Sequence, residues 1–109
     1  MKILYLPEVR LYFKELAWLL YEKEYFGFEE SAIKYVEDLF NDIDKSLPSK
    51  HSKKASSYFD RYGKNMHYAV FKKNSHTQWY VFFQILDDNG ETVYLVRYIS
   101  NNHVISHLL

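Results

Sequence analysis

One arginine and one histidine late in the chain are the residues best suited to chemistry. Arg97 stands among apolar residues of an expected strand, where an unpaired charge is costly to bury, and its guanidinium fork matches a phosphate. We expect it either to contact a phosphate or to form a structural ion pair with an acid of the preceding helices. His103 follows six residues later, and an imidazole suits acid–base work near neutral pH. A solvated histidine without a chemical role is the alternative.

Basic residues are concentrated in one segment of the chain. The formal net charge is zero, with 14 basic and 14 acidic residues, yet residues 45–73 hold eight basic residues and one acid, Asp60. Such a local field, more than the total charge, attracts a polyanion. The side chains expected to contact RNA phosphates lie here: Lys53, Lys54, Arg61, Lys64, His67, Lys72 and Lys73. Their alternative role is to be solvated or to protect a sheet edge.

Aromatic side chains are unusually frequent. They make up 19% of the chain, with eleven tyrosines, so some of them should lie at the surface. Tyr58, Tyr62, Tyr80 and Tyr98 are candidates to stack on an extruded base, the common way to hold single-stranded RNA. We expect at least two of them to pack in the core instead.

The composition excludes several kinds of site. The chain has no cysteine, which rules out disulfides, Cys-ligated zinc and thiol nucleophiles. The five histidines form no HExxH motif, so we expect no metal site. Three glycines cannot build a phosphate-cradling loop, and we expect no cofactor.

The length and hydropathy indicate one domain that does not cross a membrane. The chain has 109 residues, within the usual size of one domain, so we expect a single domain over residues 1–109. Its apolar runs are far shorter than the roughly 20 residues needed to span a bilayer. The first residues lack the apolar region of a secretory signal. A cytoplasmic location is therefore expected.

Two amphipathic helices are expected to position the candidate residues. After a short apolar strand, Met1–Leu6, apolar residues recur every three or four positions from Glu8 to about Tyr25. A second helix is expected from Glu29 to Ser46, with acids in its first turn and a proline just beyond its end. The short connection predicts an antiparallel helix hairpin.

The second half of the chain is expected to form strands. Residues Ser49–Ser57 have the composition of a polar, basic loop, and three segments rich in β-formers follow: Met66–Lys73, Thr77–Leu86 and Thr92–Ile99. Asp87–Gly90 contains the Asn-Gly pair of a tight hairpin turn. The order β-α-α-β-β-β predicts an α+β fold, with a helix hairpin packed on a mostly antiparallel four-stranded sheet.

Three stretches of the chain together carry a family pattern. In the second helix the matching residues are Ala32, Tyr35, Leu39, Ile43, Leu47 and Pro48. Tyr58–Val70 contains a glycine before the next strand, and Tyr94–Ile99 places an arginine among apolar residues. In their order and spacing these stretches resemble the RelE/ParE superfamily, the toxins of type II toxin–antitoxin modules. The resemblance implies a helix hairpin on a curved sheet over the whole chain.

The resemblance implies an activity as well as a fold. RelE-type members cut mRNA in the ribosomal A site without a metal, and such a reaction needs a proton acceptor, a cationic stabiliser and an acid. Here it would give the catalytic roles to Arg97, His103 and Tyr98, because several branches carry a histidine or tyrosine beyond the late-strand arginine. The resemblance therefore implies that the protein is a toxin that inhibits translation. It would act as a metal-independent, ribosome-dependent endoribonuclease.

Two other functions remain open on the same resemblance. A ParE-type member is implied to inhibit DNA gyrase by contact alone, without an acid–base pair. A third possibility is a toxin fold without activity that serves as an interaction protein. All three share one expected partner, a cognate antitoxin, which we expect to lie as a helix in an apolar groove and to cover the basic centre with its acids.

Overall fold

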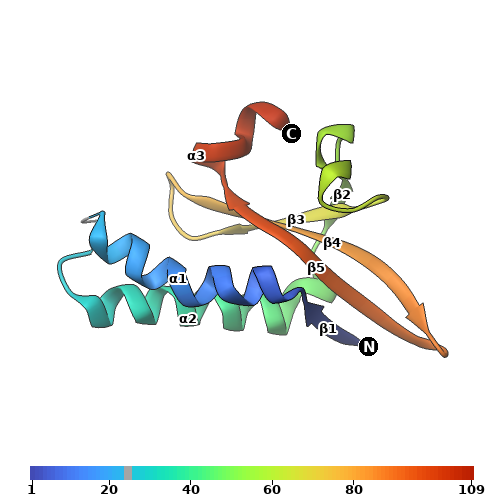
Figure 1. Cartoon of the computed structure of the whole chain (residues 1–109), viewed down its shortest axis with the longest axis horizontal. Coiled ribbons are helices and arrows are strands. Elements are labelled where there is room, and N and C mark those ends of the chain that lie inside the picture. Colours follow the sequence, from blue (N-terminus) through green and yellow to red (C-terminus); the bar gives the residue numbers. More distant parts are fainter. Residues whose placement is uncertain (24–25) are drawn as a thin grey trace.

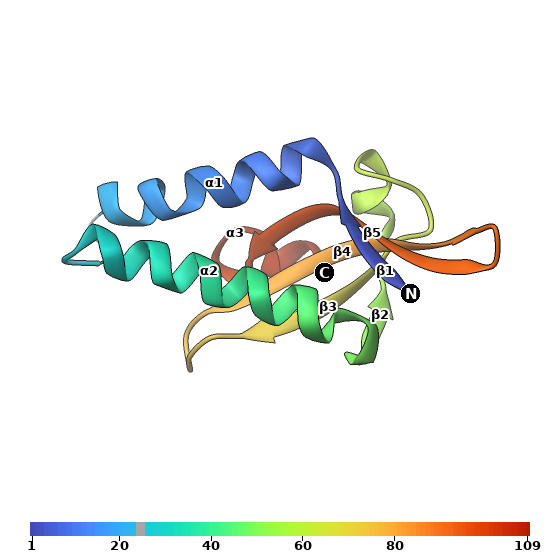
Figure 2. The same cartoon turned by 90° about the horizontal axis from the view of Figure 1, so that it is seen from below.

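The computed structural model describes residues 1–23 and 26–109. These residues form an α+β fold in which two long helices cover one face of a five-stranded sheet (Figure 1; Figure 2). The elements, in chain order, are β1 (Lys2–Tyr5), α1 (Pro7–Glu22), α2 (Glu29–Ser46), η1 (Leu47–Ser49), β2 (Ser52–Lys54), η2 (Ser57–Arg61), β3 (His67–Lys72), β4 (Gln78–Asp88), β5 (Glu91–Asn101), α3 (Asn102–Ile105) and η3 (Ser106–Leu108).

The two long helices form because their apolar residues share one face. Helix α1 begins at Pro7, whose fixed φ suits the first helical position, and α2 begins with two acids that complement the helix dipole. Their buried positions recur every three or four residues: Val9, Phe13 and Leu16 in α1, and Ala32, Val36, Leu39 and Ile43 in α2. The expected bounds of α2 are confirmed. Helix α1 ends at Glu22, and Tyr25, the expected end, lies outside the described residues.

The sheet is mixed, with the strand order β1-β5-β4-β3-β2. Strand β1 pairs with β5 in parallel, and the other three pairings are antiparallel. The β4–β5 hairpin turns at Asn89 and Gly90, which both have positive φ, as the Asn-Gly pair predicts. This long hairpin extends beyond the helices at the end of the molecule where the N-terminus lies (Figure 2).

The expected number of four strands is wrong, because the chain forms a fifth strand inside the expected loop. Residues Ser52–Lys54 pair with Ala69, Tyr68 and His67 of β3 and make an edge strand. They have no apolar periodicity, so backbone pairing alone defines this strand. Exposed lysines are typical of such edges, since they discourage further strand pairing.

The sheet has a hydrophobic core on each face. The larger core lies against α1 and α2 and includes Phe71, Trp79 and Val81. The smaller core lies on the opposite face, which we call the far face, and contains Phe59, Met66, Tyr80, Phe82 and Ile105. Segment η2 and the C-terminal α3 cover this far face, on the side away from the helix pair (Figure 1).

Among the described residues no helix has both the length and the apolar character required to span a bilayer.

Candidate functional site

A β-bulge in β5 directs Arg97 and Tyr98 to the far face. Phe82 pairs with Tyr98 but the next residue, Phe83, pairs with Val96, so Arg97 has no opposite residue on β4. Tyr98 packs against the far-face core. A bulge commonly re-aims side chains in this way and is frequent beside active sites.

The Arg97 side chain is held by a backbone carbonyl and an amide. Its Nε donates to the carbonyl oxygen of Tyr62 at 2.6 Å, and its Nη1 donates to Oε1 of Gln84 at 3.4 Å. Gln84 in turn donates from Nε2 to the carbonyl oxygen of Lys64 at 2.8 Å. These bonds tie β4 and β5 to the segment that precedes β3 and fix the position of the guanidinium.

Gly63 allows this close approach. A Cβ atom at this position would lie 2.6 Å from Cδ of Arg97, and the residue has a φ of 156°, a conformation that disfavours other residues. The glycine is therefore required both by its backbone and by the arginine beside it.

Arg97 keeps hydrogen-bonding capacity for a ligand. Two of its five N–H groups are used by Tyr62 and Gln84, and the side chain is half-buried. Among the described residues no carboxylate forms an ion pair with it. The structure thus places Arg97 against a carbonyl and an amide rather than against an acid of the helix pair, and the remaining donors can meet an anion.

Two tyrosine contacts lie on the segments next to this arginine. The rings of Tyr62 and Tyr98 stack with centroids 4.0 Å apart and an interplanar angle of 8°. The Arg61 guanidinium lies 3.8 Å from the centroid of the Tyr58 ring, and its Nε donates to the Tyr58 carbonyl at 3.0 Å. Burial, followed by the neighbouring Tyr98 hydroxyl, raises the pKa of Tyr62. We call Tyr58, Arg61, Tyr62, Arg97 and Tyr98 the Arg97 cluster.

The other predicted phosphate contacts divide between two places. Exposed Lys64 follows Gly63 and lies beside the Arg97 cluster through its bond to Gln84. The rest lie on β2, on β3 or just after it: Lys53, Lys54, His67, Lys72 and Lys73. Lys53 pairs with Tyr68 and Lys72 with Gln78, whereas the Lys73 ammonium lies 5.2 Å from the Tyr35 ring of α2. Arg61 and Lys64 therefore flank the Tyr62–Gly63 segment that Arg97 contacts, and the others lie near the edge of the sheet formed by β2.

His67 is enclosed on the side of the sheet that faces the helices. Its ring stacks over Phe83 with centroids 6.2 Å apart, and its Nδ1 is buried without a hydrogen-bond partner among the described residues. This position does not direct the imidazole toward the Arg97 cluster. Tyr80, a predicted stacking residue, is likewise buried, in the far-face core.

His103 lies apart from Arg97. It follows the end of β5, in α3, where its Nε2 lies 3.4 Å from the Thr77 hydroxyl and its backbone N–H donates to Oδ1 of Asn101. It lines a cavity with Tyr12 of α1 and Trp79 of β4. Because His103 and Arg97 share no hydrogen-bond partner, the structure does not bring the two expected catalytic residues together.

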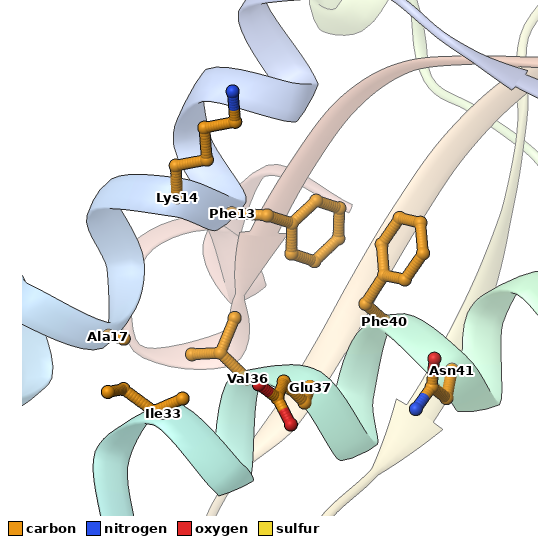
Figure 3. A pocket seen from close by; sticks show the side chains of 8 residues that line it. All are labelled: Phe13, Lys14, Ala17, Ile33, Val36, Glu37, Phe40 and Asn41. Carbon is orange, nitrogen blue, oxygen red and sulfur yellow. The ribbon is translucent and has the colours of Figure 1, made fainter. Parts of the chain in front are cut away.

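A groove runs between the two long helices on their outer side. Figure 3 shows the rings of Phe13 and Phe40 facing one another across it, with centroids 5.3 Å apart and nearly perpendicular planes. Val36 and Ile33 continue this apolar floor, and Lys14 stands at the rim (Figure 3). Its floor is apolar and its charged residues, Lys14 and Glu37, accompany that floor, so the groove is suited to contact with an amphipathic partner.

Sequence reasoning missed three residues that shape these sites. Gln84 interrupts the apolar and aromatic run from Trp79 to Leu86. A single amide in such a strand could have indicated a polar contact at this position. Tyr12 and Trp79 were indistinguishable from core residues in the sequence. No group of three or more potential ligands that could hold a metal occurs in the part of the chain that is described.

Comparisons with protein-family models, curated proteins and solved structures found no match. The function is therefore argued from the side chains themselves, and the resemblance to RelE/ParE toxins stays a prediction.

Proposed function

We propose that the protein is the toxin of a type II toxin–antitoxin module and inhibits translation by acting on mRNA at the ribosome. The Arg97 cluster is its RNA-contacting surface. The observation that supports this most is the half-buried Arg97, which keeps free N–H donors beside a stacked tyrosine pair. Arginine donors and aromatic rings are the groups that hold phosphates and unstacked bases in single-stranded RNA.

Cleavage would use these groups in defined roles. Arg97 would stabilise the negative charge that develops when a ribose 2′-hydroxyl loses its proton to water and attacks the adjacent phosphorus, which forms a 2′,3′-cyclic phosphate and breaks the bond to the 5′-oxygen of the next nucleotide. The Tyr98 hydroxyl is the nearest side-chain acid along the chain, and Arg61 and Lys64 add salt-sensitive attraction for the backbone. His103 is left outside this assignment because its contacts are to Thr77 and Asn101.

A second candidate function is inhibition of DNA gyrase by contact alone. It is favoured by one observation: within the described residues no imidazole forms a hydrogen bond to Arg97 or Tyr98. An inhibitor that acts by binding needs no acid–base pair, whereas a nuclease does.

The proposed antitoxin has a suitable docking surface on the helix pair. The outer groove offers an apolar floor of Phe13, Val36 and Phe40, with Lys14 and Glu37 along it. An amphipathic helix can lay its apolar face in such a groove. Acidic residues elsewhere in the same antitoxin would cover the Arg97 cluster.

Controlled expression in bacteria, with transcript ends mapped, tests the proposal. We expect growth arrest with new 5′ ends inside translated frames for the wild type, and loss of both for Arg97→Ala. Lys45→Ala, an exposed lysine of α2, is the matched control and should behave as wild type. Arrest with intact mRNA would support the gyrase alternative, and absence of arrest would overturn the proposal.

A further inference from the structure

A cavity of about 590 Å³ lies between α1, the start of β4 and the end of β5. This volume falls within the range of roughly 300–1,000 Å³ that is typical of small-molecule sites. The cavity does not include any residue of the Arg97 cluster. The cavity is therefore a candidate ligand site that is separate from the proposed action on RNA.

The wall of the cavity is apolar on the helix side. Leu16, Leu19 and Leu20 of α1 supply aliphatic surface, and the Trp79 indole of β4, which is only 1% exposed, borders the cavity. Trp79 is held in place because its Nε1 donates to the Tyr35 hydroxyl at 2.9 Å. An aliphatic wall backed by a fixed indole is suited to an aromatic or branched aliphatic body.

Polar groups gather where the strands end. Tyr12, Thr77, Asn101 and His103 line this part of the cavity. The Thr77–His103 contact is long, at 3.4 Å, so a ligand can compete with it. The Tyr12 hydroxyl forms no hydrogen bond to the described residues, and burial, followed by Tyr98, raises its pKa to about 12. It therefore stays protonated and available as a donor at neutral pH.

The charge of the lining favours an anion. Lys23 and His103 both line the cavity, whereas no aspartate or glutamate does so within the described residues. An anionic head group would meet donors from Tyr12, Asn101 and His103 without an opposing negative charge. Such convergent polar groups in an apolar pocket are the usual pattern of a specific ligand site.

We propose that this cavity binds a small carboxylate with an aromatic or branched aliphatic body. The body lies against the leucines of α1, close to the buried Trp79, and the carboxylate faces Tyr12, Asn101 and His103. The inference does not rest on the proposed toxin function, since none of these residues belongs to the Arg97 cluster.

Two tryptophans provide the readout. The chain contains only Trp18 and Trp79, and Trp18 is 59% exposed on α1, outside the cavity. In an NMR titration of the full chain with 1-naphthoate, we expect the indole N–H signal of Trp79 to shift and that of Trp18 to stay. The neutral analogue 1-naphthalenemethanol should bind about tenfold more weakly, because the head group then lacks its charge.

Matched variants test where 1-naphthoate binds and which side chains recognise its carboxylate. We expect His103→Ala and Lys23→Ala each to weaken 1-naphthoate binding about threefold to tenfold, and Leu19→Trp to fill the cavity and abolish it. His107→Ala, Lys45→Ala and Arg97→Ala should bind as the wild type does. The proposal is overturned if the Trp79 signal does not move, if the alcohol binds as well as the carboxylate, or if Leu19→Trp and His103→Ala leave the affinity unchanged.

Discussion

The Arg97 cluster and the His103 cavity lie along the same strand and its end, yet they differ in every property that decides chemistry. Arg97 presents free cationic donors among stacked tyrosines on the far face. His103 lies at the polar end of a cavity, beside Thr77 and Asn101. An extended strand advances about 3.3 Å per residue, so residues a few positions apart are soon in different surroundings. Proximity in sequence does not make these two residues one site.

The bulge creates this difference. Because Arg97 has no opposite residue on β4, its side chain turns toward Tyr62 and Gly63 instead of following the strand's alternation. The strand then continues regularly to Asn101, from which the chain enters α3. One irregular residue thus lies between the Arg97 cluster and the cavity at the end of the strand.

The far-face core can be broken beneath the Arg97 cluster without touching the cavity. Phe59 is 1% exposed and stacks on Phe82 with centroids 4.2 Å apart. We expect Phe59→Ala to lower the free energy of unfolding by about 3–5 kcal/mol, measured by urea denaturation. Phe28→Ala is the control, since this ring is 72% exposed. A loss below about 1 kcal/mol for Phe59→Ala would mean that this core is not packed as described.

Gly63 offers a sharper test, because it supports Arg97 directly. In Gly63→Ala the new Cβ would collide with the Arg97 side chain at an unfavourable φ. We expect a destabilisation of about 1–3 kcal/mol together with weaker binding of single-stranded RNA. Gly27→Ala is the matched control, since nothing lies within 4 Å of its Cβ position. Equal effects of the two substitutions would contradict the close packing of Arg97 on Gly63.

Arg61 tests whether the cluster attracts RNA through charge. We expect Arg61→Ala to weaken RNA binding about threefold to tenfold and to reduce the slope of log affinity against log salt by about 0.7, as measured by fluorescence anisotropy. Arg10→Ala is the counterpart on the helix side, where the Arg10 guanidinium lies over the Tyr5 ring as Arg61 does over Tyr58. An unchanged salt slope for Arg61→Ala would remove Arg61 from the RNA-contacting surface.

The smallest expected effect is a change in the free energy of unfolding at alkaline pH, caused by Tyr12 in the wall of the cavity. The pKa of Tyr12 is raised to about 12 by burial and then by Tyr98, while an unfolded tyrosine titrates near 10. The folded state holds this proton more tightly, so the stabilisation is complete below about pH 10 and is lost as pH rises to about 12. Urea denaturation on both sides of pH 10 measures this effect. The free energy of unfolding should decline less steeply with rising pH for Tyr12→Phe than for wild type.

A second tyrosine also contributes to the loss of stability at alkaline pH, and a third provides a control. The pKa of Tyr5 is also raised, by burial and by its hydrogen bond to Asp44, so the variant should keep part of the alkaline decline. Tyr21→Phe removes an exposed hydroxyl of the same helix and should follow the wild-type curve. Identical declines in wild type and Tyr12→Phe would contradict the burial of this hydroxyl.

Local patterns predicted the helices and most of the sheet. Helix α2 follows its apolar periodicity, and the β4–β5 turn follows its Asn-Gly pair. Strand β2 could not be predicted, because its side chains are polar and only its pairing with β3 defines it. The parallel pairing of β1 with β5 joins the two ends of the chain, a long-range relation that no local pattern contains.

Some residues of the candidate site were recognisable in the sequence, but their assembly was not. Arg97 was recognisable as a charge among apolar strand residues, and Gly63 as a glycine before a strand. Their contact joins segments far apart in the sequence and depends on a register shift between Phe82 and Phe83. Such a shift is set by packing on both faces of the sheet, so no spacing rule could place Arg97 on Tyr62 or move His103 away from it.

Binding of a fluorescent single-stranded RNA to the wild type, Arg97→Gln and His103→Ala, compared by anisotropy, tests the central claim most directly. The two variants each remove one of the residues that the strand separates, and far-ultraviolet circular dichroism checks that both fold. We predict a loss of about tenfold or more for Arg97→Gln and less than about twofold for His103→Ala. Equal losses in the two variants, or wild-type binding by Arg97→Gln, would contradict the claim that RNA binds at the Arg97 cluster alone.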